Sequence, residues 1–193
     1  MLQRASGLTQ EDMEAIAGLE RLVVEAEGGR ALAVGRGAAL DHSEHALVLL
    51  SEPSGGVSDP RIGLRTAGPA DAAVISQLLE AGFGRPPAGP ADRLSSDRER
   101  TLLVELGGSP VGTLRLSRHG DEARIHGFVV DPAWQGRGIG RDALRRACAQ
   151  ARAEGARRVG LEVAVDNDRA LGLYTSLGFC PVATEDYYSL ALA

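Results

Sequence analysis

Hydrophobic residues near the N-terminus follow a helical period. Between residues 9 and 27 the apolar positions recur every three or four residues, as on one face of a helix. Thr9 is suited to the N-cap, because its hydroxyl can accept a hydrogen bond from a free N–H group, and Asp12 stands three residues further on. Gly28 and Gly29 then end the pattern. The segment therefore predicts one helix.

The next residues predict two short strands and a linker. Apolar runs at 31–34 and 46–50 are strand candidates. Residues 52–60 read Glu-Pro-Ser-Gly-Gly-Val-Ser-Asp-Pro, a composition typical of a connection between domains. We therefore divide the chain into an N-terminal extension of residues 1–60 and a main domain of residues 61–193.

The main domain alternates strand-like and helix-like patterns. Strands are predicted at 61–66, 101–106, 111–117, 123–130, 159–165 and within 179–192, and helices at 69–81, 91–98, 138–153 and 168–177. Three consecutive strands joined by turns are typical of an antiparallel meander, and a strand that follows a helix favours parallel pairing. This order predicts an α+β fold in which helices flank a mixed central β-sheet.

Charge and composition narrow the class of protein. The net charge of −5 disfavours a nucleic-acid partner, and all 21 basic residues are arginine. No apolar run is long enough to span a membrane, and the polar N-terminus lacks the apolar segment of a signal peptide. Two cysteines without metal-ligand spacing suit a reducing compartment. We therefore expect a soluble cytoplasmic protein that binds no metal.

A glycine-rich turn follows the strand predicted at 123–130. The chain passes Asp131-Pro132 and then carries Gly136, Gly138 and Gly140 at alternate positions as a helix begins. The first turn of a helix presents free N–H groups and the positive end of the helix dipole, and glycine lets a phosphate approach the backbone. A merely tight connection needs only one glycine. The pattern therefore predicts a diphosphate site, to which Arg137 and Arg141 can add charge.

Two common nucleotide motifs do not fit this turn. A P-loop needs a lysine, and the chain has none. The dinucleotide fingerprint needs the spacing Gly-x-Gly-x-x-Gly near the start of a βαβ unit, whereas the spacing here is Gly-x-Gly-x-Gly after a meander. Both alternatives therefore fail on spacing and context.

The turn resembles the acetyl-CoA-binding motif of the GNAT N-acetyltransferase superfamily, whose pattern is Gln/Arg-x-x-Gly-x-Gly/Ala. Gln135, Gly138 and Gly140 fill the specified positions. A second similarity covers Leu161-Glu162-Val163, residues 167–174 and Leu177-Gly178-Phe179. The two motifs occur in the expected order, and the resemblance extends from about residue 61 to the C-terminus.

The resemblance implies a sheet whose fourth and fifth strands splay apart around the pantetheine arm of acetyl-CoA, the cosubstrate. Pantetheine would pair with the main chain of Phe128, Val129 and Val130, as an added strand would. The further cofactor-binding residues that it implies are Gln135, Gly136, Arg137, Gly138, Ile139, Gly140, Arg141 and Asn167. Tyr174 would face the thioester sulfur as general acid; the alternative is a core aromatic at helical spacing from Leu171 and Leu177.

The general base is open between His126 and Glu162. Both lie on strands that lead to the cofactor, and strand alternation predicts that His126 shares a face with Phe128 and Val130. A histidine in this place can also be structural, and many family members use no single base. Neither residue is therefore required for the activity that the resemblance implies.

The function predicted from these residues is transfer of an acetyl group from acetyl-CoA to a primary amine of a small molecule or peptide. A non-catalytic acyl-CoA-binding module and a protein N-terminal acetyltransferase are the alternatives. Residues 1–60 resemble the degenerate leading module of tandem GNAT proteins, and we expect them to pack on the catalytic domain or to mediate a homodimer. The arginines at 85, 93, 98 and 100 bind either an anionic group of the substrate or the acids Asp97 and Glu99.

Overall fold

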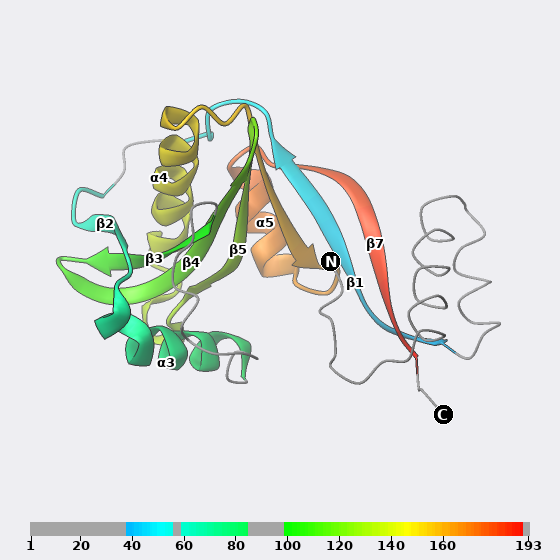
Figure 1. Cartoon of the computed structure of the whole chain (residues 1–193), viewed down its shortest axis with the longest axis horizontal. Coiled ribbons are helices and arrows are strands. Elements are labelled where there is room, and N and C mark those ends of the chain that lie inside the picture. Colours follow the sequence, from blue (N-terminus) through cyan, green and yellow to red (C-terminus); the bar gives the residue numbers. More distant parts are fainter. Residues whose placement is uncertain (1–37, 56–58, 85–98, 191–193) are drawn as a thin grey trace. The chain divides into compact units, whose positions relative to one another are not determined.

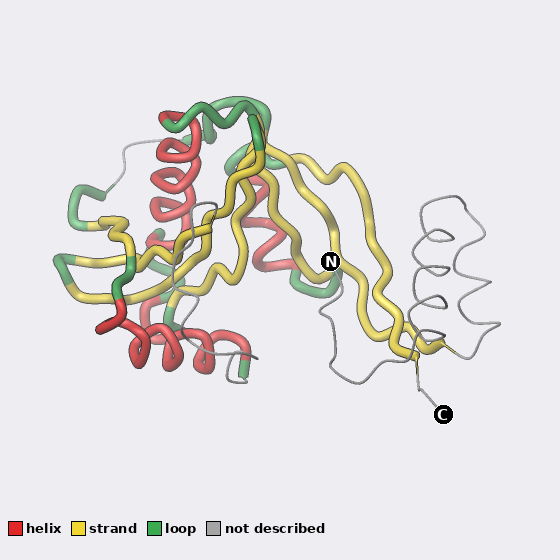
Figure 2. The backbone as a smooth tube through the Cα atoms, viewed as in Figure 1, coloured by secondary structure: helices red, strands yellow, loops and turns green. Residues whose placement is uncertain are grey.

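A computed structural model describes residues 38–55, 59–84 and 99–190 (Figures 1 and 2). Its elements are β1 (Ala38–Leu49), β2 (Ile62–Thr66), the 3-10 turn η1 (Pro69–Asp71), α3 (Ala72–Phe83), β3 (Glu99–Leu106), β4 (Ser109–His119), β5 (Glu122–Val130), the 3-10 turn η2 (Pro132–Trp134), α4 (Ile139–Ala153), β6 (Arg158–Ala164), α5 (Asp168–Ser176) and β7 (Cys180–Leu190). The helices predicted at 9–27 and 91–98 and the strand predicted at 31–34 lie outside the described residues.

The strands form one mixed sheet in the order β2-β3-β4-β5-β6-β1-β7. Strands β2 to β5 pair antiparallel in a meander, β5 and β6 pair parallel, and β6 and β1 pair antiparallel. A parallel pair needs a crossover, and α4 supplies it between β5 and β6. The predicted α+β fold with a mixed sheet and flanking helices is therefore confirmed.

Strand β1 lies N-terminal to residue 60 and yet is an inner strand of the sheet. Its residues 44–49 pair with residues 164–159 of β6, and Leu47 and Leu49 are 1% and 0% exposed. The chain divides into two compact units, residues 44–184 and residues 1–43 with 185–193. Residues 44–49, assigned by sequence to the extension, therefore belong to the unit that contains the glycine turn.

The connection from β1 to β2 is held by arginines of α4. Arg152 donates to the carbonyl of Ser51 (2.6 Å), and Arg145 donates to the carbonyl of Ser54 (3.0 Å). Arg146 donates to the carbonyl of Asp59 (3.0 Å). Within the described residues of this connection, the carbonyls of Ser51, Ser54 and Asp59 thus have side-chain donors in place of a partner strand.

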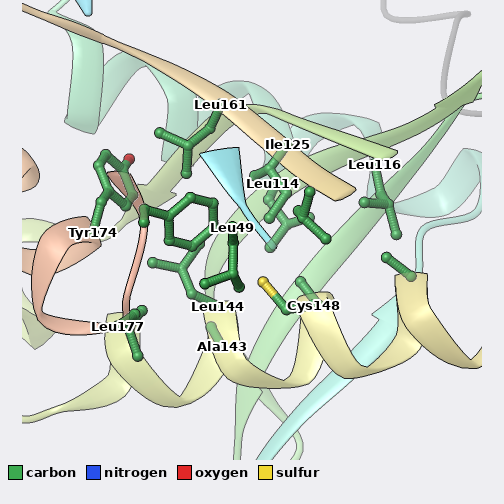
Figure 3. Packing of buried hydrophobic residues seen from close by; sticks show 14 of the residues in the cluster. Leu49, Leu114, Leu116, Ile125, Ala143, Leu144, Cys148, Leu161, Tyr174 and Leu177 are labelled. Atoms are coloured by element: carbon green, nitrogen blue, oxygen red, sulfur yellow. The ribbon is translucent and has the colours of Figure 1, made fainter. Parts of the chain in front are cut away.

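Two hydrophobic clusters pack on opposite faces of the sheet. The larger one contains the buried face of α4, and Figure 3 shows Ala143, Leu144 and Cys148 directed toward the strands. The apolar residues of this face recur at helical spacing and are buried, namely Ile139, Ala143, Leu144, Ala147, Cys148 and Ala151. The smaller cluster joins Ile75 and Leu78 of α3 to Leu103 and Val129. Within the described residues, no helix is long and apolar enough to cross a membrane.

A bulge in β5 changes which side chains face α4. Thr113 of β4 pairs with Val129, whereas Arg115 pairs with His126, so β5 advances three residues while β4 advances two. Gly127 lies at this irregularity with a φ of +55°. The extra residue reverses the alternation that follows it.

The predicted shared face of His126, Phe128 and Val130 is consequently wrong. Ile125 and Val130 belong to the cluster on the α4 face, and Phe128 packs against that cluster. Val129 belongs to the cluster under α3. His126 follows Ile125 directly, before the bulge, and therefore lies on the α3 face. Alternation counted along the sequence fails here because it assumes an uninterrupted strand.

The close packing of α3 on the sheet can be tested at Gly82, near the end of the helix. A Cβ atom at Gly82 would lie 1.9 Å from Cγ2 of Val129, whereas a Cβ atom at Gly172 in α5 would have nothing within 4 Å. We expect Gly82→Ala to lower the free energy of unfolding by about 1–3 kcal/mol through overpacking. The matched control Gly172→Ala is expected to raise it by about 0.5–1 kcal/mol, as in other helix interiors. Urea unfolding measures both, and a Gly82→Ala protein as stable as wild type would contradict this packing.

Candidate active site

The ladder between β5 and β6 ends before either strand does. Its last pair is Ile125 with Leu161, whereas β5 continues to Val130 and β6 to Ala164. Beyond Leu161, β6 keeps its pairing with β1 on its other edge. The facing edges of β5 and β6 therefore part, and the splay that the family resemblance implies is present.

The turn after β5 is fixed by local hydrogen bonds. The carboxylate of Asp131 accepts a hydrogen bond from the N–H of Ala133 (2.8 Å), which caps η2. The side-chain amide of Gln135 donates to the carbonyl of Val130 (2.8 Å). Gln135 thus ties the turn to the end of β5, and its side chain acts as a brace of the turn.

The three glycines of the turn have different structural reasons. Gly136 and Gly138 adopt φ values of +77° and +82°, and a Cβ atom on either would meet no atom of the described residues within 4 Å. Gly138 is also the N-cap of α4. These two positions need glycine for their backbone conformation and leave the N-terminus of α4 uncovered.

Gly140 differs, because its α-carbon faces the core. A Cβ atom there would lie 3.5–3.7 Å from side-chain atoms of Leu173, Phe128 and Val130, which is ordinary van der Waals contact. Packing therefore does not require glycine at residue 140, and the contact of Gly140 with a phosphate stays a prediction from the sequence. The contact distances also explain why alanine is an alternative to glycine at this position of the motif.

Arginines and an acid surround the start of α4. The guanidinium of Arg137 lies over the ring of Trp134, with Cζ 4.8 Å from the ring centroid. Arg141 donates to the hydroxyl of Ser176 in α5 (3.1 Å). Asp142, which the sequence analysis did not consider, is buried in the first turn, accepts a hydrogen bond from the N–H of Asp59 (2.7 Å) and pairs with Arg145 (3.0 Å). The carboxylate of Asp142 is therefore neutralised from within the fold.

Helix α5 carries the two remaining predicted residues. Asn167 is its N-cap and accepts a hydrogen bond from the N–H of Ala170 (3.1 Å). Tyr174 is 7% exposed, and its ring meets Phe179 edge to face at 6.1 Å. Figure 3 shows the hydroxyl oxygen of Tyr174 at the end of the ring nearest Leu161, where the β5–β6 ladder ends.

The hydroxyl of Tyr174 is in an apolar environment. Burial raises its pKa to about 12, so the phenol is protonated at neutral pH. Within the described part of the chain, this hydroxyl has no hydrogen-bond partner. Tyr174 is thus a core aromatic that still keeps a proton donor at the splay.

The two candidate bases lie where the strands part, on the face away from α4. Nε2 of His126 is 3.1 Å from Oγ of Ser117, and Glu162 pairs with Arg124 (3.0 Å). Burial, and then the charge of Arg115, lower the pKa of His126 below its ordinary value of 6.5. The structure therefore brings both candidates to the splay on the face opposite the cluster that contains Tyr174.

The arginine cluster predicted between α3 and β3 is described only at Arg100. This residue pairs with Glu154 (2.5 Å), while Glu99 pairs with Arg115 (3.1 Å). Arg100 therefore forms its ion pair within the fold, but its partner is neither Asp97 nor Glu99, the acids that the sequence predicted. The arginines at 85, 93 and 98 lie outside the described residues. In the described ranges, no group of three His, Cys, Asp or Glu side chains is arranged to hold a metal ion.

Comparison with known proteins identifies relatives of this chain. N-alpha-acetyltransferase RimI of Mycobacterium tuberculosis is 42% identical over 107 residues, which are 53% of this chain and 66% of RimI. Mycothiol acetyltransferase of Beutenbergia cavernae is 48% identical over 66 residues, 34% of this chain and 22% of that protein. The chain therefore spans less than two thirds of either relative.

A solved structure shows the same fold. The GCN5-related N-acetyltransferase from Sphaerobacter thermophilus aligns with a TM-score of 0.68 at 24% identity, over 84% of this chain and 56% of that chain. The profile of the Acetyltransferase (GNAT) family matches residues 74–179, a span that includes the splay, the glycine turn and α5. Since this match covers more than half of the sequence and both motifs, the chain belongs to the acetyltransferase (GNAT) family.

Proposed function

We propose that this protein transfers an acetyl group from acetyl-CoA to a primary amine. The observation that carries the proposal is the parting of β5 and β6 directly before a turn whose glycines leave the N-terminus of α4 uncovered. A pantetheine arm needs backbone partners, and a diphosphate needs N–H donors with positive charge. The two requirements are met by consecutive segments of the chain.

The diphosphate is assigned to the turn from Gln135 to Arg141. The N–H groups at the start of α4 have no partners within the helix, and the helix dipole favours an anion there. Arg137 and Arg141 supply positive charge. Gln135 stabilises the turn through its hydrogen bond to the carbonyl of Val130. Asn167 takes part through the cap that fixes the start of α5.

The pantetheine arm is assigned to the edge of β5 at Phe128, Val129 and Val130. This edge has lost its partner strand, since the β5–β6 ladder ends at Ile125. Amide groups of pantetheine can pair with such an edge in the way that a β-strand does. The acetyl thioester then lies at the point where the strands part, near Tyr174.

Acetyl transfer requires one proton to be removed and one to be supplied. The neutral amine attacks the thioester carbonyl, the C–N bond forms, and the C–S bond breaks to release the thiolate of CoA. Tyr174 donates a hydrogen bond to the sulfur as negative charge develops on it and supplies the proton. A positioned acid of this kind contributes about 10²–10⁴-fold to the rate.

The proton of the amine is lost on the opposite face of the sheet. His126 is mainly neutral at pH 7, because its pKa is lowered, and a neutral imidazole accepts a proton. Glu162, whose carboxylate pairs with Arg124, is the rival acceptor. Acid and base on opposite faces suit a reaction in which the thioester lies between them.

Of the two alternatives, one is favoured by a specific observation and the other is disfavoured by one. The similarity to N-alpha-acetyltransferase RimI favours the α-amine of a peptide or protein as the acceptor. A non-catalytic acyl-CoA-binding module needs only the turn and the splay, whereas a tyrosine hydroxyl kept at the splay favours an enzyme. The cytoplasmic location, the homodimer and the remnant nature of residues 1–60 stay predictions from the sequence.

Substituting Tyr174 by phenylalanine tests the proposal. The change removes one hydroxyl and keeps the ring that packs against Phe179. We expect kcat to fall about 10²-fold or more, with the affinity for CoA unchanged. Release of free thiol from acetyl-CoA over a panel of metabolite amines and short peptides measures kcat, and calorimetry measures CoA affinity. Tyr187→Phe, which removes a hydroxyl bonded to Glu185, is the matched control with unchanged turnover.

The outcomes separate the alternatives. Wild-type protein that binds no CoA refutes the proposed function altogether. Binding of CoA without turnover of any amine above the Tyr174→Phe level favours the binding module. Turnover confined to peptides favours the N-terminal acetyltransferase, and turnover of free metabolites favours a small-molecule acceptor.

The lowered pKa of His126 predicts a pH dependence of folding. His126 binds a proton more readily in the unfolded chain than in the folded one. Its contribution to the free energy of unfolding is therefore fully present above pH 6.5 and declines as the pH falls below that value. We expect His126→Gln to remove this part of the decline in urea unfolding between pH 7.5 and 5, and Glu162→Gln, which removes a charge that raises the pKa of His126, to deepen it. An equal slope in wild type and His126→Gln would contradict the assignment.

The same pair of variants identifies the proton acceptor. The acceptor is the residue whose substitution removes the acid limb of the pH profile of kcat/KM. A limb that survives both substitutions excludes both as single bases.

A further inference from the structure

We propose that Trp134 is a positioning residue, which holds the guanidinium of Arg137 at the cofactor turn in readiness for the diphosphate of CoA. This inference rests on the proposed function, because it needs CoA to bind at the turn. It adds a residue that belongs to neither sequence motif, and it predicts how binding energy is divided between Trp134 and Arg137.

Trp134 is fixed in place before any ligand arrives. It is the last residue of η2, and its N–H donates to the carbonyl of Asp131 (2.8 Å). The Asp131 carboxylate caps the same turn at Ala133. The half-buried indole also packs against the main hydrophobic cluster. Its ring is therefore a rigid surface at the edge of the turn.

Arg137 is brought back onto that surface by the glycines on either side of it. Gly136 and Gly138 have φ values of +77° and +82°, which other residues rarely adopt. The resulting turn brings Cζ of Arg137 to 4.8 Å from the indole centroid, and Nη2 lies 3.4 Å from the carbonyl of Ala133. The guanidinium is thus held by a face contact and one long hydrogen bond.

A guanidinium over an aromatic ring keeps most of its hydrogen-bonding capacity. Arginine has five N–H donors, and the hydrogen bond to Ala133 uses one of them, so donors remain available for phosphate oxygens. A free arginine side chain loses considerable rotamer entropy when it meets a ligand. Stacking on Trp134 removes part of that freedom in advance and so strengthens the later contact.

Arg141 does not depend on Trp134 in this way. Its guanidinium donates to Ser176 of α5 (3.1 Å), and its backbone lies in the first turn of α4. The aromatic ring therefore acts on one of the two arginines at the turn. The expected effect is on the binding of the cofactor and not on the acetyl transfer, which takes place at the splay.

A double-mutant cycle on the full chain tests the proposal, with CoA as the probe and calorimetry as the measurement. Trp134→Leu is expected to weaken CoA binding about two- to fivefold, the range for a cation–π contact at an exposed site. Arg137→Gln is expected to weaken it about five- to tenfold, in line with loss of a charged hydrogen bond partly screened by solvent. In the Arg137→Gln protein, Trp134→Leu is expected to have no further effect.

Two additional readouts exclude a merely structural role. Trp134→Phe keeps an aromatic face and is expected to restore most of the affinity that Trp134→Leu loses. Trp134→Leu is expected to raise KM for acetyl-CoA while kcat stays unchanged, because the interaction is the same in ground state and transition state. Thermal melting of each variant establishes that it is folded.

The outcomes distinguish this inference from the proposed function. If wild-type protein fails to bind CoA, the proposed function fails and the inference with it. If wild type binds CoA but Trp134→Leu weakens binding equally with and without Arg137, Trp134 does not act through Arg137 and the inference is overturned. Unchanged affinity in Trp134→Leu overturns it as well.

Discussion

The site depends on the point at which hydrogen bonding between β5 and β6 stops. A backbone edge needs partners, and β5 gives up its neighbour after Ile125 although the strand continues to Val130. β6 tolerates the separation because β1 pairs with residues 159–164 on its other edge. The bulge at Gly127 lies within the freed part of β5 and sets which side chains face each side. The proposed pantetheine arm, with its amide groups, would pair with the backbone edge that the sheet leaves open.

The two faces of the sheet give the reaction two environments. On the α4 face, Tyr174 stands in the main hydrophobic cluster, where burial keeps its phenol protonated. On the other face, His126 and Glu162 lie among charged partners such as Arg124 and Arg115. A proton donor in a dry setting and proton acceptors in a polar one are suited to the two ends of an acyl transfer.

Arginine supplies all 21 of the Lys and Arg side chains in this chain, which contains no lysine. Its several planar donors let Arg145, Arg146 and Arg152 hold carbonyl groups of the segment between β1 and β2. The guanidinium of Arg137 lies over the ring of Trp134 and keeps further donors beside its one hydrogen bond to Ala133. A lysine ammonium would provide the charge but neither the stacking face nor the fork of donors.

The sequence alone determined the features that depend on neighbouring residues: the buried face of α4 follows from its period, and the turn before α4 follows from glycines at alternate positions. It also identified the family, since both motifs consist of short segments that can be recognised along the chain. Only the tertiary structure decided that His126 faces away from Phe128, that Gly140 faces the core, and that β1 is an inner strand. These depend on strand register and on contacts between distant segments, which local periodicity does not contain.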